Sequence, residues 1–294
     1  MRKIIIGVIA AMALFPVAAA AVTVGPPRLE YKAAPGDSFA GSMFLQNESD
    51  ATKTFYPDFQ TFTERNGEKV FLKEESDLAS WFRMPESITL KPDEKVDIPF
   101  TIEVPRDAAP GGHFAVIWWG AAANPKSGEQ VAIVTRAGVL VYFTVSGDIE
   151  EAGAISRFDA GGTLFARPPV VFDIEFTNNG NVALKPTGHI RMRNLFGGGA
   201  TTVPVNRNAA IILPGTSKAL NAELPSGSFF GPYRAELALA YGEKGIPAED
   251  SVWLFFFPPF TTAITVVVLL LITFLPAILR RYNAWIINKS RQEL

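Results

Sequence analysis

The residues best suited to metal binding or nucleophilic chemistry are scarce in this chain. It has two histidines, His113 and His189, and no cysteine, and neither histidine has a second ligand at metal-binding spacing. The glycines at 197–199 lack the lysine and helix of a phosphate-binding loop. Acidic pairs at 74–75 and 150–151 are typical of solvated polar loops. The sequence therefore predicts a protein that is not an enzyme and has no cofactor or metal. An envelope hydrolase with carboxylates from distant strands stays an open alternative.

Aromatic residues offer a more specific chemistry, which is binding. Neighbouring side chains of a strand point to opposite faces, so Trp118 and Trp119 cannot both enter a core. The same argument applies to Trp81 and Phe82. An outward tryptophan can stack on a sugar ring or anchor a protein partner. We therefore take Trp118, Trp119 and Trp81 as candidate ligand-binding residues, with His113, which follows a Pro-Gly-Gly turn. The conservative interpretation is that the outward ring is covered by a loop or by another domain.

An apolar run near the C-terminus predicts where these residues are displayed. Residues 260–279 carry no charge over twenty positions, enough for a helix that crosses a bilayer. Pro276 is expected to kink its last turn. Arg280 and Arg281 follow at once, so the positive-inside rule places the tail, residues 280–294, in the cytoplasm. The rest of the chain is then extracellular or periplasmic, held by one span in the cytoplasmic membrane.

The N-terminus independently predicts export. Arg2 and Lys3 precede an apolar stretch at 4–17, and small residues follow at 18–21. This order is typical of a cleaved signal peptide, which we assign to residues 1–21.

Composition narrows the class of protein further. An exported chain without cysteine is stabilised without disulfides, which favours a bacterial envelope protein. Hydrophobic residues make up 48% of the chain and include 23 phenylalanines, enough to form cores by burial alone. The net charge is −2 and no basic cluster lies outside the termini, which argues against nucleic acid as a partner.

Between the two terminal segments, the hydrophobic period is that of strands. In residues 95–104, Val96, Ile98, Phe100 and Ile102 alternate with polar residues, which predicts a strand with one buried face. Pro99 on the polar side suggests an edge position. We predict further strands in residues 22–147 at 29–32, 39–46, 53–62, 87–90, 113–120 and 131–145. Seven strands at this spacing predict an immunoglobulin-like antiparallel β-sandwich.

A polar, small-residue stretch at 150–162 predicts a domain boundary near residue 147. A second strand series follows in residues 148–257. We predict its strands at 170–177, 189–195, 201–205, 209–213, 218–224, 233–241 and 251–257. The predicted fold is thus all-β, with two tandem sandwiches, 22–147 and 148–257, followed by one C-terminal transmembrane helix. Because the last strand runs almost directly into that helix, the second sandwich should stand at the membrane.

The first domain resembles the WxL-interacting proteins of Gram-positive cell surfaces. The residues that carry the resemblance are APGD at 34–37, SWF at 80–82 and APGGHFA at 109–115. The resemblance implies that the first domain binds peptidoglycan and that the second engages WxL-domain or host proteins. The second domain, with NNGNV at 178–182 and LPG at 213–215, resembles a wider class of bacterial immunoglobulin-like modules.

Two functions follow as hypotheses. The first is a membrane-anchored binding or scaffolding protein whose outer domain binds peptidoglycan or another envelope polymer. The alternative is an assembly or chaperone-like protein that pairs with secreted surface proteins by adding their strand to an exposed sheet edge.

Overall fold

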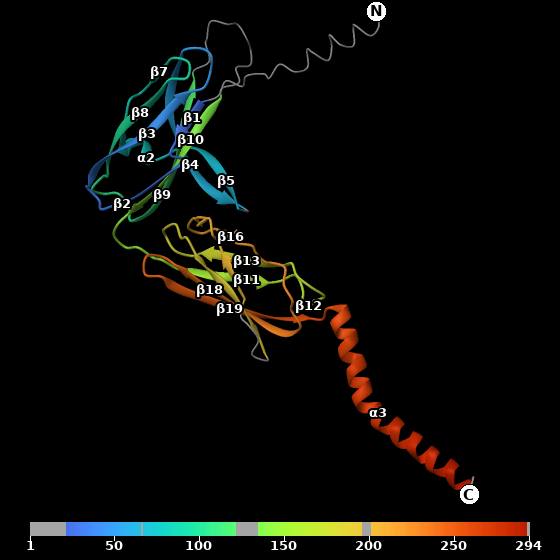
Figure 1. Cartoon of the computed structure of the whole chain (residues 1–294). Coiled ribbons are helices and arrows are strands. Elements are labelled where there is room, and N and C mark those ends of the chain that lie inside the picture. The colour runs from blue at the N-terminus through green and yellow to red at the C-terminus, as the bar shows by residue number, and fades with distance from the viewer. Residues whose placement is uncertain (1–21, 66, 122–134, 196–200, 293–294) are drawn as a thin grey trace, which may run out of the picture. The chain divides into compact units, whose positions relative to one another are not determined.

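The computed structural model describes residues 22–65, 67–121, 135–195 and 201–292. The predicted signal peptide and part of the predicted strand 131–145 lie outside these residues. The chain forms two compact units and a C-terminal helix (Figure 1). The first unit runs to Ala152 and includes Gly180–Ala183 and Leu213–Thr216, and the remaining residues form the second. The prediction of an all-β, immunoglobulin-like fold followed by one apolar helix is confirmed.

The first unit is a sandwich of two sheets. One sheet has the strand order β1 (Val22–Gly25), β3 (Ser38–Asn47), β8 (Lys95–Glu103) and β6 (Phe82–Arg83). The other has the order β2 (Arg28–Ala33), β10 (Arg136–Val145), β9 (Gly111–Ala121), β4 (Lys53–Arg65) and β5 (Glu68–Glu75), and β7 (Ile88–Leu90) also pairs with β4. A short helix, α2 (Leu78–Trp81), connects the sheets.

The alternation predicted for residues 95–104 is confirmed in β8. Ile98, Phe100 and Ile102 are buried in the core between the sheets, whereas Lys95 and Asp97 are exposed. Pro99 lies opposite Ser42 of β3. On its other side, β8 pairs with β6 only at Thr101 and Ile102 among the described residues. The missing N–H of Pro99 therefore falls where no described strand needs it.

The first segment of the sandwich changes sheets. β1 pairs antiparallel with β3, and β2 pairs parallel with β10. Between the two lie Pro26 and Pro27, which have no N–H to continue a ladder. The sequence did not predict β1, because four residues are too short to show a period.

The second unit is also a two-sheet sandwich. In one sheet, β13 (Val170–Asn178) pairs with β11 (Gly153–Asp159), β16 (Ser217–Ala219) and β17 (Ala222–Leu224). The other has the order β12 (Leu164–Phe165), β19 (Ile246–Phe256), β18 (Gly231–Tyr241), β14 (Thr187–Asn194) and β15 (Thr201–Val205).

Several predicted elements are corrected. The stretch 150–162, for which no strand was predicted, contains β11, which pairs with β13. Residues 209–213 form no strand and contribute only the bridge between Leu184 and Ile212. The predicted strand 218–224 is divided into β16 and β17. The charged strand β5 was not predicted, because its sequence lacks clean alternation. For β5 and β11, pairing with a neighbouring strand decided the outcome over the local sequence pattern.

Each sandwich buries an asparagine at the end of a central strand. Asn47 ends β3, and its amide nitrogen donates to the carbonyl oxygens of Ala51, Leu90 and Lys91 at 2.8–3.1 Å. Its Oδ1 accepts from Ser49. Asn178 ends β13 and donates to the carbonyl oxygen of Ile212 at 2.9 Å. These amides donate to backbone carbonyl oxygens beside the strand ends, and the carbonyl oxygen of Ile212 also accepts from the N–H of Leu184 at 3.0 Å.

The C-terminal helix, α3, spans Pro259–Gln292, longer than the predicted 260–279. Its segment Thr262–Asn283 has a mean hydropathy of 2.7 and is long and apolar enough to cross a membrane. Pro276 lies inside the helix, which continues past it. Apolar side chains such as Ile272 and Phe274 are exposed along this segment.

Candidate functional site

The two tryptophans of β9 point to opposite faces, as predicted. Trp119 is fully buried in the core, where its Nε1 donates to Sδ of Met43 at 3.4 Å. Trp118 lies on the outer face of the sheet and is half-buried. Only Trp118 of this pair is therefore placed to contact a ligand.

Side chains of its own sheet surround Trp118. Its Nε1 donates to Oε1 of Gln60 at 3.0 Å, and the ring of Phe71 meets it edge-on with centroids 5.1 Å apart. The Arg136 guanidinium lies 4.3 Å from the ring centroid, a cation–π contact. The indole also lies over Gly138, its direct partner on β10. Among the described residues, the contacts of the outward ring thus come from β4, β5 and β10 of its own sheet, and they leave the ring half-buried.

Trp118 belongs to a row of aromatic rings, which we call the outer aromatic cluster. Its members on β4, β5, β9 and β10 are Phe62, Phe71, Phe114, Trp118 and Tyr142. Ring centroids of contacting pairs lie 5.1–6.3 Å apart. Burial, reinforced by the nearby charge of Glu64, raises the pKa of Tyr142 to about 12. The face is therefore a second apolar layer with neutral phenol and indole groups.

His113 is held by a different set of contacts. Its Nδ1 lies 2.6 Å from Oδ2 of Asp77, and its Nε2 lies 2.9 Å from the carbonyl oxygen of Ala109. Burial alone lowers the pKa of His113, but these two hydrogen bonds outweigh it, so the pKa lies above its ordinary value. The hydrogen bond from His113 lowers the pKa of Asp77. Since both ring nitrogens face acceptors, the site favours an imidazolium that fastens α2 to β9.

Trp81 completes the His113 environment, with ring centroids 4.8 Å apart. Trp81 and Phe82 are both buried, so the expectation that one of them points outward is wrong. The physical reason is that Trp81 ends the helical turn α2, where side chains do not alternate between two faces.

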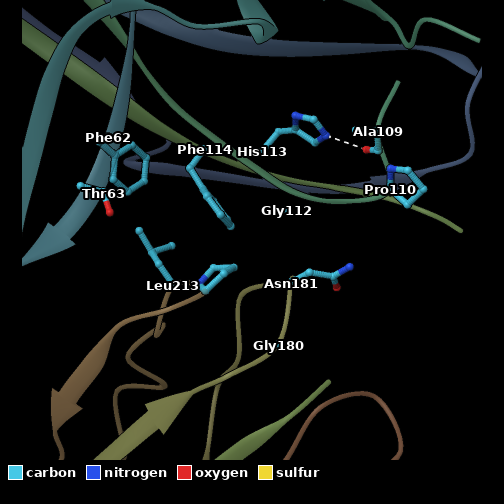
Figure 2. A pocket seen from close by; sticks show the side chains of 11 residues that line it. Phe62, Thr63, Ala109, Pro110, Gly112, His113, Phe114, Gly180, Asn181 and Leu213 are labelled. Atoms are coloured by element: carbon cyan, nitrogen blue, oxygen red, sulfur yellow. Dashed lines mark hydrogen bonds between the residues drawn. The ribbon is translucent and has the colours of Figure 1, made fainter. Parts of the chain in front are cut away.

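A cavity of about 420 Å³ lies next to this histidine, lined only by residues of the first unit (Figure 2). Phe62 and Phe114 face it from the sheet, and Leu213 faces it from the segment 213–216. The His113 ring is engaged with Ala109, away from the space that Phe62 and Phe114 enclose (Figure 2). No carboxylate lines the cavity, and among the described residues no group of three or more His, Asp or Glu could hold a metal ion.

The other histidine lies in the second unit. His189 lines a shallow cavity of about 630 Å³ across β14, β18 and β19, together with Arg191, Arg234, Glu236 and Glu249. This surface mixes charges of both signs, and the structure does not bring His189 together with any other candidate site residue.

The sequence did not predict that part of β10 lacks a pairing strand on one side among the described residues. β2 pairs with β10 only along residues 140–145. At the start of this ladder, the N–H of Leu140 donates to the carbonyl oxygen of Pro27 at 3.1 Å. Backbone groups alternate sides along a strand, so the N–H and C=O of Gly138 and Arg136 point to that same side.

No strand among the described residues pairs with residues 136–139 on the side away from β9. β1 approaches β10 but makes its ladder with β3. We call residues 136–139 the open half of β10. The signal in the sequence was Pro26-Pro27, which cannot extend the β2 ladder toward residue 136.

Fold and site together define a protein of two immunoglobulin-like β-sandwiches and a C-terminal helix able to cross a membrane. No protein-family model and no curated protein matches the chain, so kinship with the WxL-interacting proteins stays a prediction. Among solved structures, the class 5 fimbriae chaperone CfaA is similar at 12% identity, covering 81% of this chain and 100% of that chain with a TM-score of 0.43. The E. coli chaperone DraB matches at 12% identity over 79% of this chain and 98% of that chain, with a TM-score of 0.38.

A complex of Salmonella enterica SafA pilin with the SafB chaperone is also similar. It matches at 12% identity over 81% of this chain and 99% of that chain, with a TM-score of 0.40. Likeness at this level concerns the arrangement of strands and does not identify a function.

Proposed function

We propose that the chain is a membrane-anchored envelope protein whose first sandwich binds an extended segment of a secreted protein by strand addition. The observation that carries the proposal is the open half of β10, which lacks a ladder partner among the described residues. Open N–H and C=O groups on a sheet edge are a template for another strand. No catalytic step is part of this function.

The side chains beside this edge favour a partner of defined chemistry. Gly138 has no side chain, and the indole of Trp118 lies over it. On the outer face the added strand meets the indole of Trp118 and the guanidinium of Arg136. We therefore expect a segment with an apolar or aromatic residue opposite Gly138 and an acidic residue near Arg136.

The anchor in this proposal is α3. Its apolar segment Thr262–Asn283 would span the cytoplasmic membrane. Arg280 and Arg281 near the end of that segment would hold the C-terminus in the cytoplasm, with both sandwiches outside.

Binding of peptidoglycan or another envelope polymer is the second candidate. It is favoured by Tyr56, which is exposed on the same outer face as Trp118 and lies beside Asp58 and Gln60. An exposed ring flanked by polar side chains can stack on a sugar. This site lies on the face of the sheet and not on its edge, so the two functions depend on different residues.

A matched pair of substitutions separates these functions. Arg136→Ala removes the cation–π contact but keeps the backbone N–H, whereas Arg136→Pro also removes the N–H that points to the open side. Proline is tolerated at the first residue of a strand, so the β9 ladder should survive. Full-length chain, solubilised from its own envelope, is used to capture partners under conditions that preserve protein complexes.

Strand addition predicts one protein captured in stoichiometric amount, with its retention reduced about tenfold or more by Arg136→Pro relative to Arg136→Ala. Equal capture by both variants would rule out pairing at this edge. Retention on purified wall material that free glycan competes away, and that Tyr56→Ala abolishes, would support the polymer instead.

A further inference from the structure

Large apolar side chains gather at one end of the second sandwich. Leu164 is 70% exposed, Leu195 63%, and Phe230 and Phe257 are each 44% exposed. Monomeric soluble proteins seldom expose several large apolar side chains next to one another. We call these four residues the apolar rim.

Backbone and ring contacts show that the rim is one surface. Leu164 pairs with Phe255, and the N–H of Phe257 donates to the carbonyl oxygen of Phe165 at 2.9 Å. The rings of Phe230 and Phe257 meet edge-on with centroids 6.5 Å apart.

Leu195 joins the rim from β14. Its N–H donates to the carbonyl oxygen of Pro232 at 3.2 Å, beside the start of β18. The rim therefore gathers a residue of β12 and residues that follow β14, precede β18 and follow β19.

The opposite end of the same strands exposes polar and charged residues. The turn between β18 and β19 exposes Glu243 and Lys244, and the loop after β15 exposes Arg207 and Asn208. The two ends of one sandwich are thus polar and apolar, and the apolar end is the one from which the chain enters α3. Phe257 is followed by Pro258, Pro259 and then Phe260, which is 76% exposed.

We propose that the apolar rim is a lipid-binding surface that rests in the interfacial layer of the membrane crossed by α3. Its covalent continuity with the apolar helix selects lipid as the occupant, because insertion of α3 brings the rim to the bilayer surface. Arg167, exposed three positions after Leu164, is placed to reach lipid phosphates while the rim side chains enter the acyl boundary. The rim would hold the second sandwich against the bilayer instead of leaving it free on a tether. The inference rests on membrane anchoring but not on strand addition.

The absence of cysteine makes a direct test available. Single-cysteine variants Leu164→Cys and Phe230→Cys are labelled with a nitroxide in the full chain, reconstituted in nanodiscs of phosphatidylcholine and phosphatidylglycerol. Lys244→Cys at the polar end serves as the aqueous control, and Leu271→Cys within α3 serves as the bilayer control. Electron paramagnetic resonance then compares the collision of each label with oxygen, which partitions into lipid, and with a water-soluble nickel chelate.

The proposal expects labels at 164 and 230 to collide several-fold less with the nickel chelate than the label at 244, and more with oxygen. Labels at 164 and 230 that match the label at 244, while the label at 271 is in lipid, would overturn the rim and leave the anchor intact. A label at 271 that is also in water would overturn both. Protection of the rim that requires an added envelope extract would point to a protein and contradict the lipid assignment.

Discussion

The indole of Trp118 occupies the space where Gly138 would carry a side chain. The two residues are direct partners across the β9–β10 ladder, and a Cβ on Gly138 would lie 2.7 Å from Cε3 of the indole and 2.7 Å from Cγ2 of Val116. A tryptophan on the outer face is thereby held against the half of β10 that no described strand pairs with on the side away from β9.

Enlarging Gly138 should therefore displace this ring. We expect Gly138→Val to destabilise the first sandwich by about 1–3 kcal/mol, the usual cost of overpacking. In the background of Trp118→Ala the same change should cost much less, because the competing ring is gone. Urea unfolding of the four chains of this double-mutant cycle measures the coupling. Additive effects would show that the two residues do not compete for space.

The two tryptophans of β9 should respond differently to truncation. Trp119→Ala leaves a cavity in the core and should cost about 3–5 kcal/mol, a large share of the roughly 5–15 kcal/mol that stabilises a typical domain. Trp118→Ala removes a half-buried ring and should cost about 1 kcal/mol while weakening partner capture. Circular dichroism with thermal melts distinguishes the outcomes, and similar losses in the two variants would contradict the opposite facing of the rings.

The contact between Asp77 and His113 should make stability depend on pH. The pKa of His113 is raised in the folded state, so its contribution is complete below the ordinary value of 6.5 and is lost as pH rises through the folded value. The pKa of Asp77 is lowered, so its contribution is present above 3.8 and is lost as pH falls through the folded value. The stabilising effect of the pair is therefore greatest between these two ordinary values.

Asp77→Asn tests this dependence, because asparagine can still cap α2 at the N–H of Leu78. We expect the variant to lose about 1 kcal/mol at pH 5, a modest value because Asp77 is partly exposed, and distinctly less at pH 9. Urea unfolding at both pH values, with Asp107→Asn on the surface as the control, provides the measurement. A loss that is equal at pH 5 and pH 9 would exclude the charged pair.

The buried amide of Asn47 should be among the most sensitive polar groups of the first sandwich. Asn47→Ala leaves the carbonyl oxygens of Ala51, Leu90 and Lys91 without this donor, so we expect a loss of about 3 kcal/mol or more. Asn47→Asp should be no better, since a carboxylate offers no donor to them. Chemical denaturation checks the size of the loss, with Glu48→Ala next to it as the exposed control.

The sequence predicted those strands whose hydrophobic residues alternate with a two-residue repeat. The alternation around Ile98 and Phe100 predicted β8 and its buried face, because burial on one side of a strand leaves a two-residue repeat. β5 and β11 carry no such repeat, and only their ladders with β4 and β13 made them strands. Likewise Trp81 could not be placed outward or inward from its neighbours, since the turn α2 is too short to show a helical period.

By itself, the sequence determined the two β-sandwiches, the apolar helix that follows them and the opposite facing of Trp118 and Trp119. These depend on local composition and on spacing along one segment, which a single chain displays directly. Only the tertiary structure decided that Trp118 packs against Phe71 and Arg136, that His113 contacts Asp77, and that no described strand pairs with residues 136–139 on the side away from β9. Each of these depends on which distant strand lies alongside which, and pairing over long sequence separations leaves no repeat in the chain from which it could be predicted.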